Sequence, residues 1–273
     1  MKTIYHLYLT VLAVLFYSSC TKEEVHSFMG EPAINFTSQE YQLGDMPNSQ
    51  DDPDNPNQMG YTSNFAAHYK KGQFTDKYDT VYVKAKLEGM LQEHPLRVNL
   101  AYEPVEGYDT PTLVLPKDSV IKAGEYYVRM AVLVERPAVY NKEYQVKIMF
   151  DYANSDVVAG AGSEERQSII LKASDEYEIS QENMGVESEE EWNNAFASYI
   201  GTYGPVKVRF ILSVFKDRTT QIFVYTPYGF GIGFDNPDNV ETLKEALDAY
   251  NAKHGALTEP DGTVVTFEPA EVK

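Results

Sequence analysis

The sequence predicts a mainly β protein: an antiparallel sandwich over about residues 33–172, followed by a smaller α+β region over residues 192–273. Three long segments alternate apolar and polar side chains with a period of two, as half-buried strands do. Their apolar faces are Val81, Val83, Ala85 and Leu87; Tyr126, Val128, Met130, Val132 and Val134; and Tyr144, Val146, Ile148 and Phe150. The side chains expected to face outward are Tyr82, Lys84, Lys86, Glu88, Gln145 and Lys147.

Shorter segments complete the predicted sandwich, which has seven or eight strands separated by turn residues. We expect these strands over residues 33–36, 63–69, 96–102, 113–115 and 167–172. Between Leu43 and Gly60 the chain has almost no apolar residue, which predicts a mobile loop or hairpin insertion. Its acids lack the spacing of a calcium loop because Pro53 and Pro56 interrupt it, so a polar loop is favoured over a calcium site.

Residues 173–191 are rich in acids and predict an acidic linker that ends as a helix N-terminus, where acids are favoured. A helical face follows in Trp192, Phe196, Tyr199 and Ile200. Residues 206–215 fit either a strand, whose alternation fails at Ile211, or a helix opened by Pro205, and we favour the helix.

The end of the chain predicts two further strands, over residues 221–226 and 264–267, on either side of a helix. That helix is expected over residues 238–255, with Asp238 and Glu241 as its capping pair and Gly255 at its end.

The N-terminus has the layout of a bacterial lipoprotein signal peptide over residues 1–19. Lys2 precedes an apolar run over residues 7–16, and the small residues Ser18 and Ser19 precede Cys20, the single cysteine of the chain. Cleavage before Cys20 would leave a cysteine for acylation, followed by a tether over residues 20–32. Disulfide stabilisation within the chain is excluded by the cysteine count.

The net charge of the chain limits which kinds of partner it can bind. The net charge of −18 repels nucleic acid phosphates and anionic headgroups, so we expect no nucleic acid partner and membrane attachment through lipid. After Cys20, the residues Lys22, Glu23 and Glu24 resemble the acidic export tag of Bacteroidota lipoproteins, although a solvated tether has the same composition. The resemblance implies a lipid-anchored protein of the outer membrane that faces the cell exterior.

Four strings in order resemble the Bacteroidota lipoprotein family known as domain of unknown function 4843. They are residues 83–89, a strand before a Gly turn; residues 120–124, Val-Ile-Lys-Ala-Gly; residues 133–137, Leu-Val-Glu-Arg-Pro; and residues 200–208, which follow Trp192. Lys122 and Gly204 depart from the family pattern. The resemblance implies an Ig-like or Calx-β-like sandwich with a smaller appended region, on surface lipoproteins often linked to glycan utilisation. It brings no catalytic residue.

No motif specifies a reaction, a cofactor or a metal. In Gly229-Phe230-Gly231-Ile232-Gly233-Phe234, Phe234 stands where a dinucleotide fingerprint needs glycine, so a turn that packs aromatics is favoured. The histidines after Cys20 lie far from one another, without metal-ligand spacing. Acids are numerous enough to flank a glycosidic bond in space, so an enzyme remains the least favoured alternative.

Aromatic residues are the best candidates for ligand contact, because Tyr and Trp faces stack on sugar rings and on partner proteins. The candidates outside the predicted core faces are Tyr82, Tyr108, Tyr127, Trp192, Tyr225 and Tyr228. Each has a structural alternative: Tyr82 and Tyr127 could be cross-strand partners, and Trp192 could anchor the C-terminal region on the sandwich. Thr80 and Ser119 lie in Asp-Thr-Val and Asp-Ser-Val strings, which resemble O-glycosylation sites of the same phylum.

We therefore expect a non-enzymatic surface lipoprotein that binds a glycan or a protein partner of a nutrient-uptake system. The alternative is a structural or adhesive envelope protein without a small-molecule ligand.

The lipoprotein assignment predicts that Cys20→Ala abolishes incorporation of a clickable fatty acid in the native bacterium. Stable anchoring needs two or more acyl chains, and the cysteine is their expected attachment point. The variant should therefore leave the membrane fraction or remain unprocessed. Label on the alanine variant equal to that on the parent would contradict the assignment.

Overall fold

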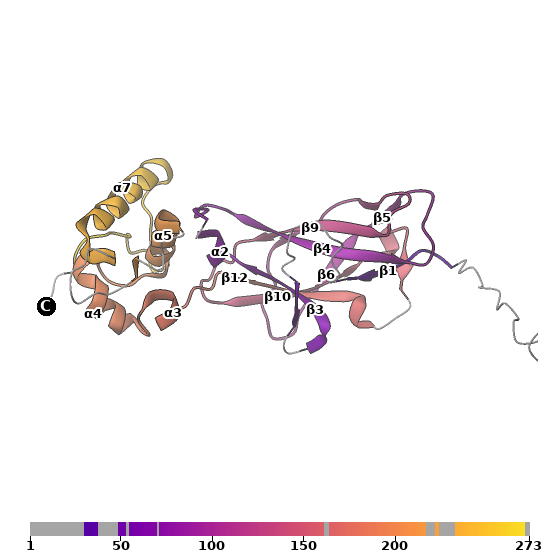
Figure 1. Ribbon diagram of the computed structural model, residues 1–273, viewed down its shortest axis with the longest axis horizontal. Coiled ribbons are helices and arrows are strands. Elements are labelled where there is room, and N and C mark those ends of the chain that lie inside the picture. Colours follow the sequence, from indigo (N-terminus) through magenta and orange to yellow (C-terminus); the bar gives the residue numbers. More distant parts are fainter. Residues whose placement is uncertain are drawn as a thin grey trace, which may run out of the picture.

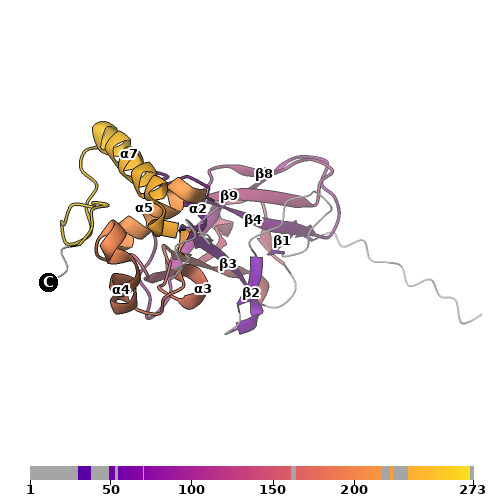
Figure 2. The same cartoon turned by 60° about the vertical axis from the view of Figure 1, so that its left-hand side comes forward.

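A β-sandwich and a cluster of helices at one of its ends make up the fold (Figure 1). This is a computed structural model, and it describes residues 30–37, 49–52, 55–69, 71–160, 164–216, 222–223 and 233–270. Figure 2 shows the same helices gathered beside the end of the sandwich that carries α2. The predicted mainly β class with an Ig-like sandwich is confirmed.

The first sheet has the strand order β11-β1-β4-β9-β7. Its strands are β1 (Ala33–Phe36), β4 (Tyr78–Glu88), β7 (Leu113–Val114), β9 (Tyr127–Glu135) and β11 (Val158–Ala159). All neighbours are antiparallel except β1 and β11. The two long strands β4 and β9 therefore lie inside the sheet, flanked on both sides.

The second sheet has the order β2-β3-β12-β10-β6, in which only β3 and β12 are parallel. Its strands are β2 (Ser49–Asp52), β3 (Asn55–Asn64), β6 (Leu100–Pro104), β10 (Glu143–Phe150) and β12 (Ser168–Ser174). The polar stretch before Gly60 thus contributes strand β2 and the start of β3. Of the mobile loop and the hairpin insertion that were expected here, the hairpin is the one observed.

The single strand expected over residues 96–102 is instead two strands, β5 (Leu96–Val98) and β6, in different ladders. β5 pairs with β8 (Ser119–Ile121) in a separate two-stranded sheet. The chain changes ladder at Asn99, whose side chain donates to the carbonyl of Asn154 and accepts from the backbone N–H of Asp118. These side-chain bonds replace the ladder and divide the strand.

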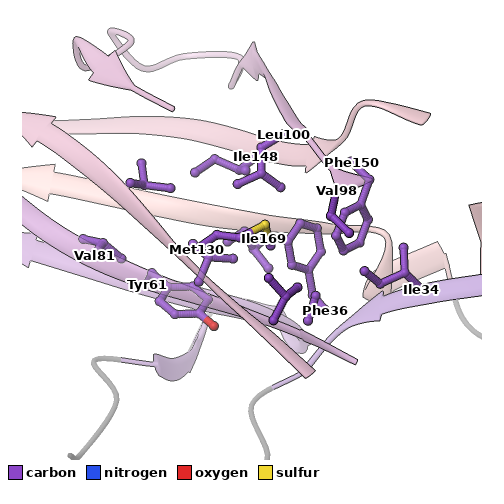
Figure 3. Packing of buried hydrophobic residues seen from close by; sticks show 14 of the residues in the cluster. Ile34, Phe36, Tyr61, Val81, Val98, Leu100, Met130, Ile148, Phe150 and Ile169 are labelled. Carbon is purple, nitrogen blue, oxygen red and sulfur yellow. The ribbon is translucent and has the colours of Figure 1, made fainter. Parts of the chain in front are cut away.

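The core of the sandwich lies between the two long sheets, and its side chains are almost fully buried (Figure 3). Phe36 and Phe150 stack across it with ring centroids 4.0 Å apart. The alternation of β4 is borne out, since Val81, Val83 and Leu87 are no more than 1% exposed.

Two residues depart from the predicted faces. Gln145 was expected outside but is 6% exposed, because the loop at Asp109 pairs beside β10 and accepts its backbone N–H. Tyr126 was expected in the core but precedes β9 and is 37% exposed.

The strand expected over residues 63–69 ends at Asn64 and becomes the short helix α2 (Ala66–Tyr69). The side-chain oxygen of Asn64 accepts the backbone N–H groups of Ala66 and Glu176. An Asn side chain that caps a turn in this way stops a strand and starts a helical turn. As a result Tyr69 points into the helical region.

Three longer helices build the C-terminal region: α4 (Glu189–Ile200), α5 (Pro205–Phe215) and α7 (Pro237–His254). The short helices are α3 (Gln181–Met184) and the 3-10 turns η1 (Tyr152–Asn154), η2 (Glu164–Arg166) and η4 (Gly233–Asp235). The preference for a helix over residues 206–215 is confirmed, with Pro205 in its first turn.

The predicted cap of α7 is wrong by two residues. Asn236 caps the helix by accepting the backbone N–H of Asp238, and Pro237 is the first helical residue. Gly255 ends the helix as expected, with φ of 85°.

The two strands expected in this region are also absent from the described residues. Ile222 and Phe223 are helical and turn-like, and residues 221 and 224–226 lie outside the described residues. At the second position a single bridge joins Val264 to Thr258, while Val265 and Phe267 are buried in the helical core. Burial against helices explains the β-type composition here without a sheet.

The acid-rich segment 173–191 is more deeply packed than a solvated linker. Tyr177, Met184 and Val186 are at most 5% exposed and belong to the helical core. Ser188 caps α4 by accepting the backbone N–H of Glu191, and three acids occupy its first turn, as predicted.

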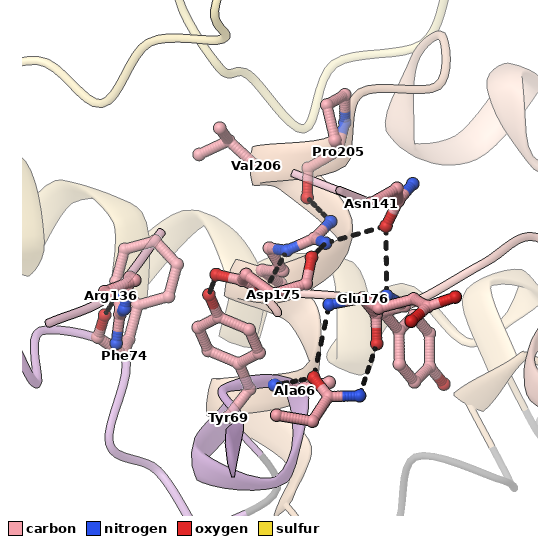
Figure 4. Close-up of polar contacts among 12 residues, drawn as sticks. Ala66, Tyr69, Phe74, Arg136, Asn141, Asp175, Glu176, Pro205 and Val206 are labelled. Atoms are coloured by element: carbon pink, nitrogen blue, oxygen red, sulfur yellow. Dashed lines mark hydrogen bonds and ion pairs between the residues drawn. The ribbon is translucent and has the colours of Figure 1, made fainter. Parts of the chain in front are cut away.

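A buried ion pair joins the sandwich to the helices (Figure 4). The Arg209 Nε of α5 lies 2.8 Å from the Asp175 carboxylate just after β12, and both side chains are at most 1% exposed. Three further guanidinium hydrogens go to the carbonyls of Asp175 and Pro205 and to the side-chain oxygen of Asn141. The Tyr69 hydroxyl donates to the other carboxylate oxygen of Asp175. We call these four side chains the junction network.

We predict that Asp175→Asn lowers the free energy of unfolding by about 3–5 kcal/mol, because it leaves the Arg209 charge buried without a carboxylate. The matched control is Asp156→Asn, which breaks the Arg97–Asp156 pair, whose side chains are 59% and 38% exposed. This change should lower the free energy of unfolding far less, because exposed ion pairs contribute little to stability. Urea titration followed by fluorescence of Trp192, the single tryptophan, measures both; equal small effects would contradict the role of the network.

Candidate ligand-binding face

The central strands of the first sheet present aromatic and cationic side chains together on their outer face. Tyr82, Lys84 and Lys86 alternate with the buried residues of β4, and Tyr127 and Arg129 do the same on β9. We call these five residues the tyrosine–cation face. Their outward direction follows from the period of two, since the residues between them fill the core.

Strand register brings the five side chains together. Lys84 is paired with Arg129, Lys86 with Tyr127, and Tyr82 with Ala131. Along β4, Tyr82 and Lys86 are four residues apart, which is about 13 Å in a strand. The face is therefore long enough to contact an extended polymer at two rings.

Both tyrosines lie against cations. The Arg129 guanidinium carbon is 3.6 Å from the centroid of the Tyr82 ring, and Tyr82 is still 44% exposed. The Lys86 ammonium is 5.9 Å from the Tyr127 centroid. Cation–π contact of this kind holds an exposed ring in a fixed orientation.

An apolar edge continues the face beyond Tyr82. Ala131 and Leu133 point outward on β9, and Val114 of β7 pairs with Leu133 and is 47% exposed. The face therefore changes from apolar to cationic along the strands.

The other aromatic candidates lie elsewhere. Tyr108 is 45% exposed but lies in the loop before Asp109, which bridges to Tyr144 of the second sheet. Trp192 is 0% exposed and packs against Phe196, Tyr203 and Phe223, so it is wrong as a surface contact. These partners belong to the core of the helical region, so Trp192 fills that core and is not an anchor on the sandwich. Tyr225 and Tyr228 lie outside the described residues.

The predicted modification sites are both half-buried at strands. Thr80 lies on β4 beside the tyrosine–cation face, and Ser119 begins β8. Glycosylation of either residue stays a prediction. The lipidation site Cys20 and the tag residues Lys22, Glu23 and Glu24 lie outside the described residues.

A cavity of about 430 Å³ lies between α2 and α3, lined by Asn64, Ala66, Ala67, Glu176, Tyr177, Glu178 and Asn183. Burial, followed by the neighbouring Glu178 and Glu143, raises the pKa of Glu176. Because Glu178 also hydrogen-bonds to Glu176, the two carboxyls are in contact. A glycosidase needs its two carboxyls about 5–9 Å apart around the scissile bond, so this pair does not have that geometry.

A second polar cluster joins α2 to β4. His68 Nε2 is 3.1 Å from Asp79 and Nδ1 is 3.6 Å from Asp76, while the Ser63 hydroxyl donates to Asp79 at 2.7 Å. A serine nucleophile would need to donate to the histidine, and here it donates to the carboxylate instead. The cluster therefore connects elements and does not activate a hydroxyl.

Sequence reasoning missed Arg129, Asp79 and the junction network. Arg129 could have been predicted from the sequence, because the alternation of β9 places it on the same side as Tyr127. The pairing of Asp175 with Arg209 had no local signal, since 34 residues separate the partners.

Among the described residues no three His, Cys, Asp or Glu side chains are grouped to hold a metal ion. Within the same ranges no helix has the length and apolarity needed to cross a membrane.

Comparisons with known proteins give remote likenesses. No family model and no curated protein matches the chain, so the resemblance to domain of unknown function 4843 stays a prediction. Among solved structures, the apo form of the Calx CBD1 domain matches with a TM-score of 0.30 and 11% identity, covering 44% of this chain and 91% of that one.

Two Bacteroides structures match at the same level. The endoglycosidase EndoBT-3987 of Bacteroides thetaiotamicron, solved with a Man5GlcNAc product, has a TM-score of 0.30 and 8% identity, over 53% of this chain and 31% of that one. A protein of unknown function from Bacteroides ovatus has a TM-score of 0.30 and 9% identity, over 51% and 43% of the two chains. Likenesses this remote carry no functional argument.

The His68 cluster predicts a pH dependence of stability. The hydrogen bond with Asp79 raises the pKa of His68, while burial opposes it. Burial would raise the pKa of Asp79, but bonds from His68 and Ser63 outweigh it and lower that pKa. Protonated His68 therefore stabilises the fold below about pH 6.5, and this contribution is lost as pH rises through the raised pKa.

Between about pH 6.5 and the raised pKa of His68, the free energy of unfolding should fall by up to about 1.4 kcal/mol per pH unit. His68→Gln should remove that fall. Urea titrations of parent and variant from pH 6 to pH 9 measure the slope. The same slope in both proteins would show that His68 is not its origin.

Proposed function

We propose that the protein is a non-enzymatic lipoprotein, anchored through Cys20 on the outer surface of the outer membrane, that binds a glycan on the tyrosine–cation face. The observation that carries the binding proposal is the exposed Tyr82 ring, oriented by Arg129 and in register with a second ring, Tyr127. Sugar rings present apolar faces that stack on such aromatics.

The anchoring part of the proposal rests on the signal layout before Cys20 and the acidic residues after it. The supporting observation for surface display is Lys22, Glu23 and Glu24. A glycan-binding protein at the cell exterior has access to polymers that are too large to cross the envelope, which fits a role as an accessory component of nutrient uptake.

Position on the sheet also favours ligand binding over a purely structural role. β4 and β9 have hydrogen-bonded neighbours on both sides, so their face is available through side chains while their edges are not. A protein partner that adds a strand would need an open edge, whereas a sugar polymer contacts the side chains alone.

We predict that Tyr82→Ala combined with Tyr127→Ala weakens glycan binding by roughly tenfold or more, because two stacking surfaces are lost. The matched control is Tyr102→Ala combined with Tyr108→Ala, which removes tyrosines that are 47% and 45% exposed elsewhere on the sandwich. Affinity electrophoresis of the parent protein against a broad polysaccharide panel first identifies its ligand. The binding of the two double variants to that ligand is then measured in the same way.

Loss of binding in the Tyr102 and Tyr108 variant, with unchanged binding in the Tyr82 and Tyr127 variant, would place the site elsewhere. If the parent binds no polysaccharide and instead captures another envelope protein from the native membrane, the structural or adhesive alternative replaces this proposal.

A further inference from the structure

Exposed apolar side chains lie at the end of the sandwich opposite the helices, in the loop between β4 and β5 (Figure 1). Met90 and Leu91 in this loop are 58% and 43% exposed. Of the large apolar side chains that the structure describes, Met90 is the most exposed, and these two are the only exposed pair that is adjacent in sequence. Tyr126, which is 37% exposed, lies beside the same loop. We call Met90, Leu91 and Tyr126 the end patch.

Hydrogen bonds hold the loop that presents the end patch. The backbone N–H of Leu87 donates to the carbonyl of Tyr126 at 2.7 Å, and the backbone N–H of Gly124 donates to the carbonyl of Gln92 at 2.9 Å. The Gln92 side chain also donates to the carbonyl of Met90. The apolar side chains are therefore exposed on a fixed turn, where folding gives them no partner to bury against.

The end patch lies where the described part of the chain begins. Ala33, the first residue of β1, pairs with Glu88, the last residue of β4, and the loop follows directly. Residue 30 comes ten residues after Cys20. A chain of that length spans at most about 36 Å. An acyl chain on Cys20 would therefore hold this end of the sandwich within that distance of the membrane.

We propose that the end patch inserts into the lipid surface that carries the anchor. This inference rests on the anchoring part of the proposed function and adds a second contact between the protein and the membrane. Met90 and Leu91 would leave water for an apolar environment, which is favourable. A Tyr ring such as that of Tyr126 suits the interface, because its body is apolar and its hydroxyl is polar.

The size of the end patch favours lipid over a protein partner. A stable protein–protein interface takes about 20–30 residues on each side, far more than these few side chains provide. Its charge does not supply the attraction, since the net charge of −18 repels anionic headgroups. Glu125, next to the patch, is paired with Lys122 at 3.6 Å. Apolar contact is therefore the interaction that holds the patch on the membrane.

A contact of this size is too weak to hold the protein on a membrane alone, but an anchor changes this. Once the acyl chains of Cys20 are inserted, the end patch meets the membrane at a high effective concentration, because the link between them is short. The contact then decides how the protein is oriented. The long axis of the sandwich stands on the membrane, and the helical end points away from it (Figure 1).

The test couples a single myristoyl chain to Cys20, the only cysteine, in the purified mature chain that begins at this residue. One such chain gives marginal, reversible membrane binding, so partitioning responds to a second contact. Met90→Ser combined with Leu91→Ser should partition about tenfold less than the parent into phosphatidylcholine vesicles, measured by sedimentation. Added salt should not weaken the partitioning of the parent, because apolar contact is not screened.

The matched control is Val139→Ser combined with Val264→Ser. These side chains are 51% and 50% exposed, and they lie at the helical end, in the loop before β10 and near the end of the chain. The control variant should partition within about twofold of the parent. An equal loss in both variants would mean that apolar exposure anywhere on the protein has the same effect, and the end patch would have no special role.

The outcomes separate this inference from the proposed function. Equal partitioning of the parent and the patch variant overturns the inference and leaves the anchor intact, because fatty acid labelling in the bacterium tests the anchor separately. If the native protein carries no acyl chain, the anchor fails, and the membrane contact fails with it. If the parent self-associates in sedimentation velocity and the patch variant does not, the patch binds a second copy of the chain and the lipid assignment is wrong.

Thermal unfolding of the patch variant gives an independent check. Met90→Ser combined with Leu91→Ser should unfold at the temperature of the parent, because exposed side chains away from packed features contribute little to stability. A clear drop in the unfolding temperature would show that the two side chains serve the fold, and the argument from their exposure would then be overturned.

Discussion

The Arg209–Asp175 ion pair is the constraint on which the arrangement of the two parts depends. A buried guanidinium is tolerated only if its charge and its hydrogen bonds are met, and here the partners come from several separate segments. Asp175 follows β12, Asn141 precedes β10, and Tyr69 ends the helix after β3. The pair therefore brings the ends of three neighbouring chain segments to one face of α5.

This requirement also explains why the acidic segment after β12 is ordered. Once Asp175 is held, Tyr177 is placed where its backbone N–H reaches the side chain of Asn141. Met184 and Val186 then join the core that contains Trp192. The ion pair of Asp175 thus places the following eleven residues, up to Val186, so that their apolar side chains can be buried.

The tyrosine–cation face is independent of this junction. It depends on the register of two strands inside the first sheet, and its side chains take no part in either core. A rigid central pair of strands holds exposed rings more precisely than a loop would.

Local periodicity by itself determined much of this protein. The alternation of β4 shows in the sequence that Tyr82, Lys84 and Lys86 face outward, because side-chain direction in a strand depends only on the residue's own position. The helix over residues 206–215 was likewise readable from Pro205 and its apolar stripe. Only the tertiary structure decided which residues meet. It paired Lys84 with Arg129, turned residues 66–69 into a helix and buried Trp192, because strand register and burial depend on partners far away in the chain.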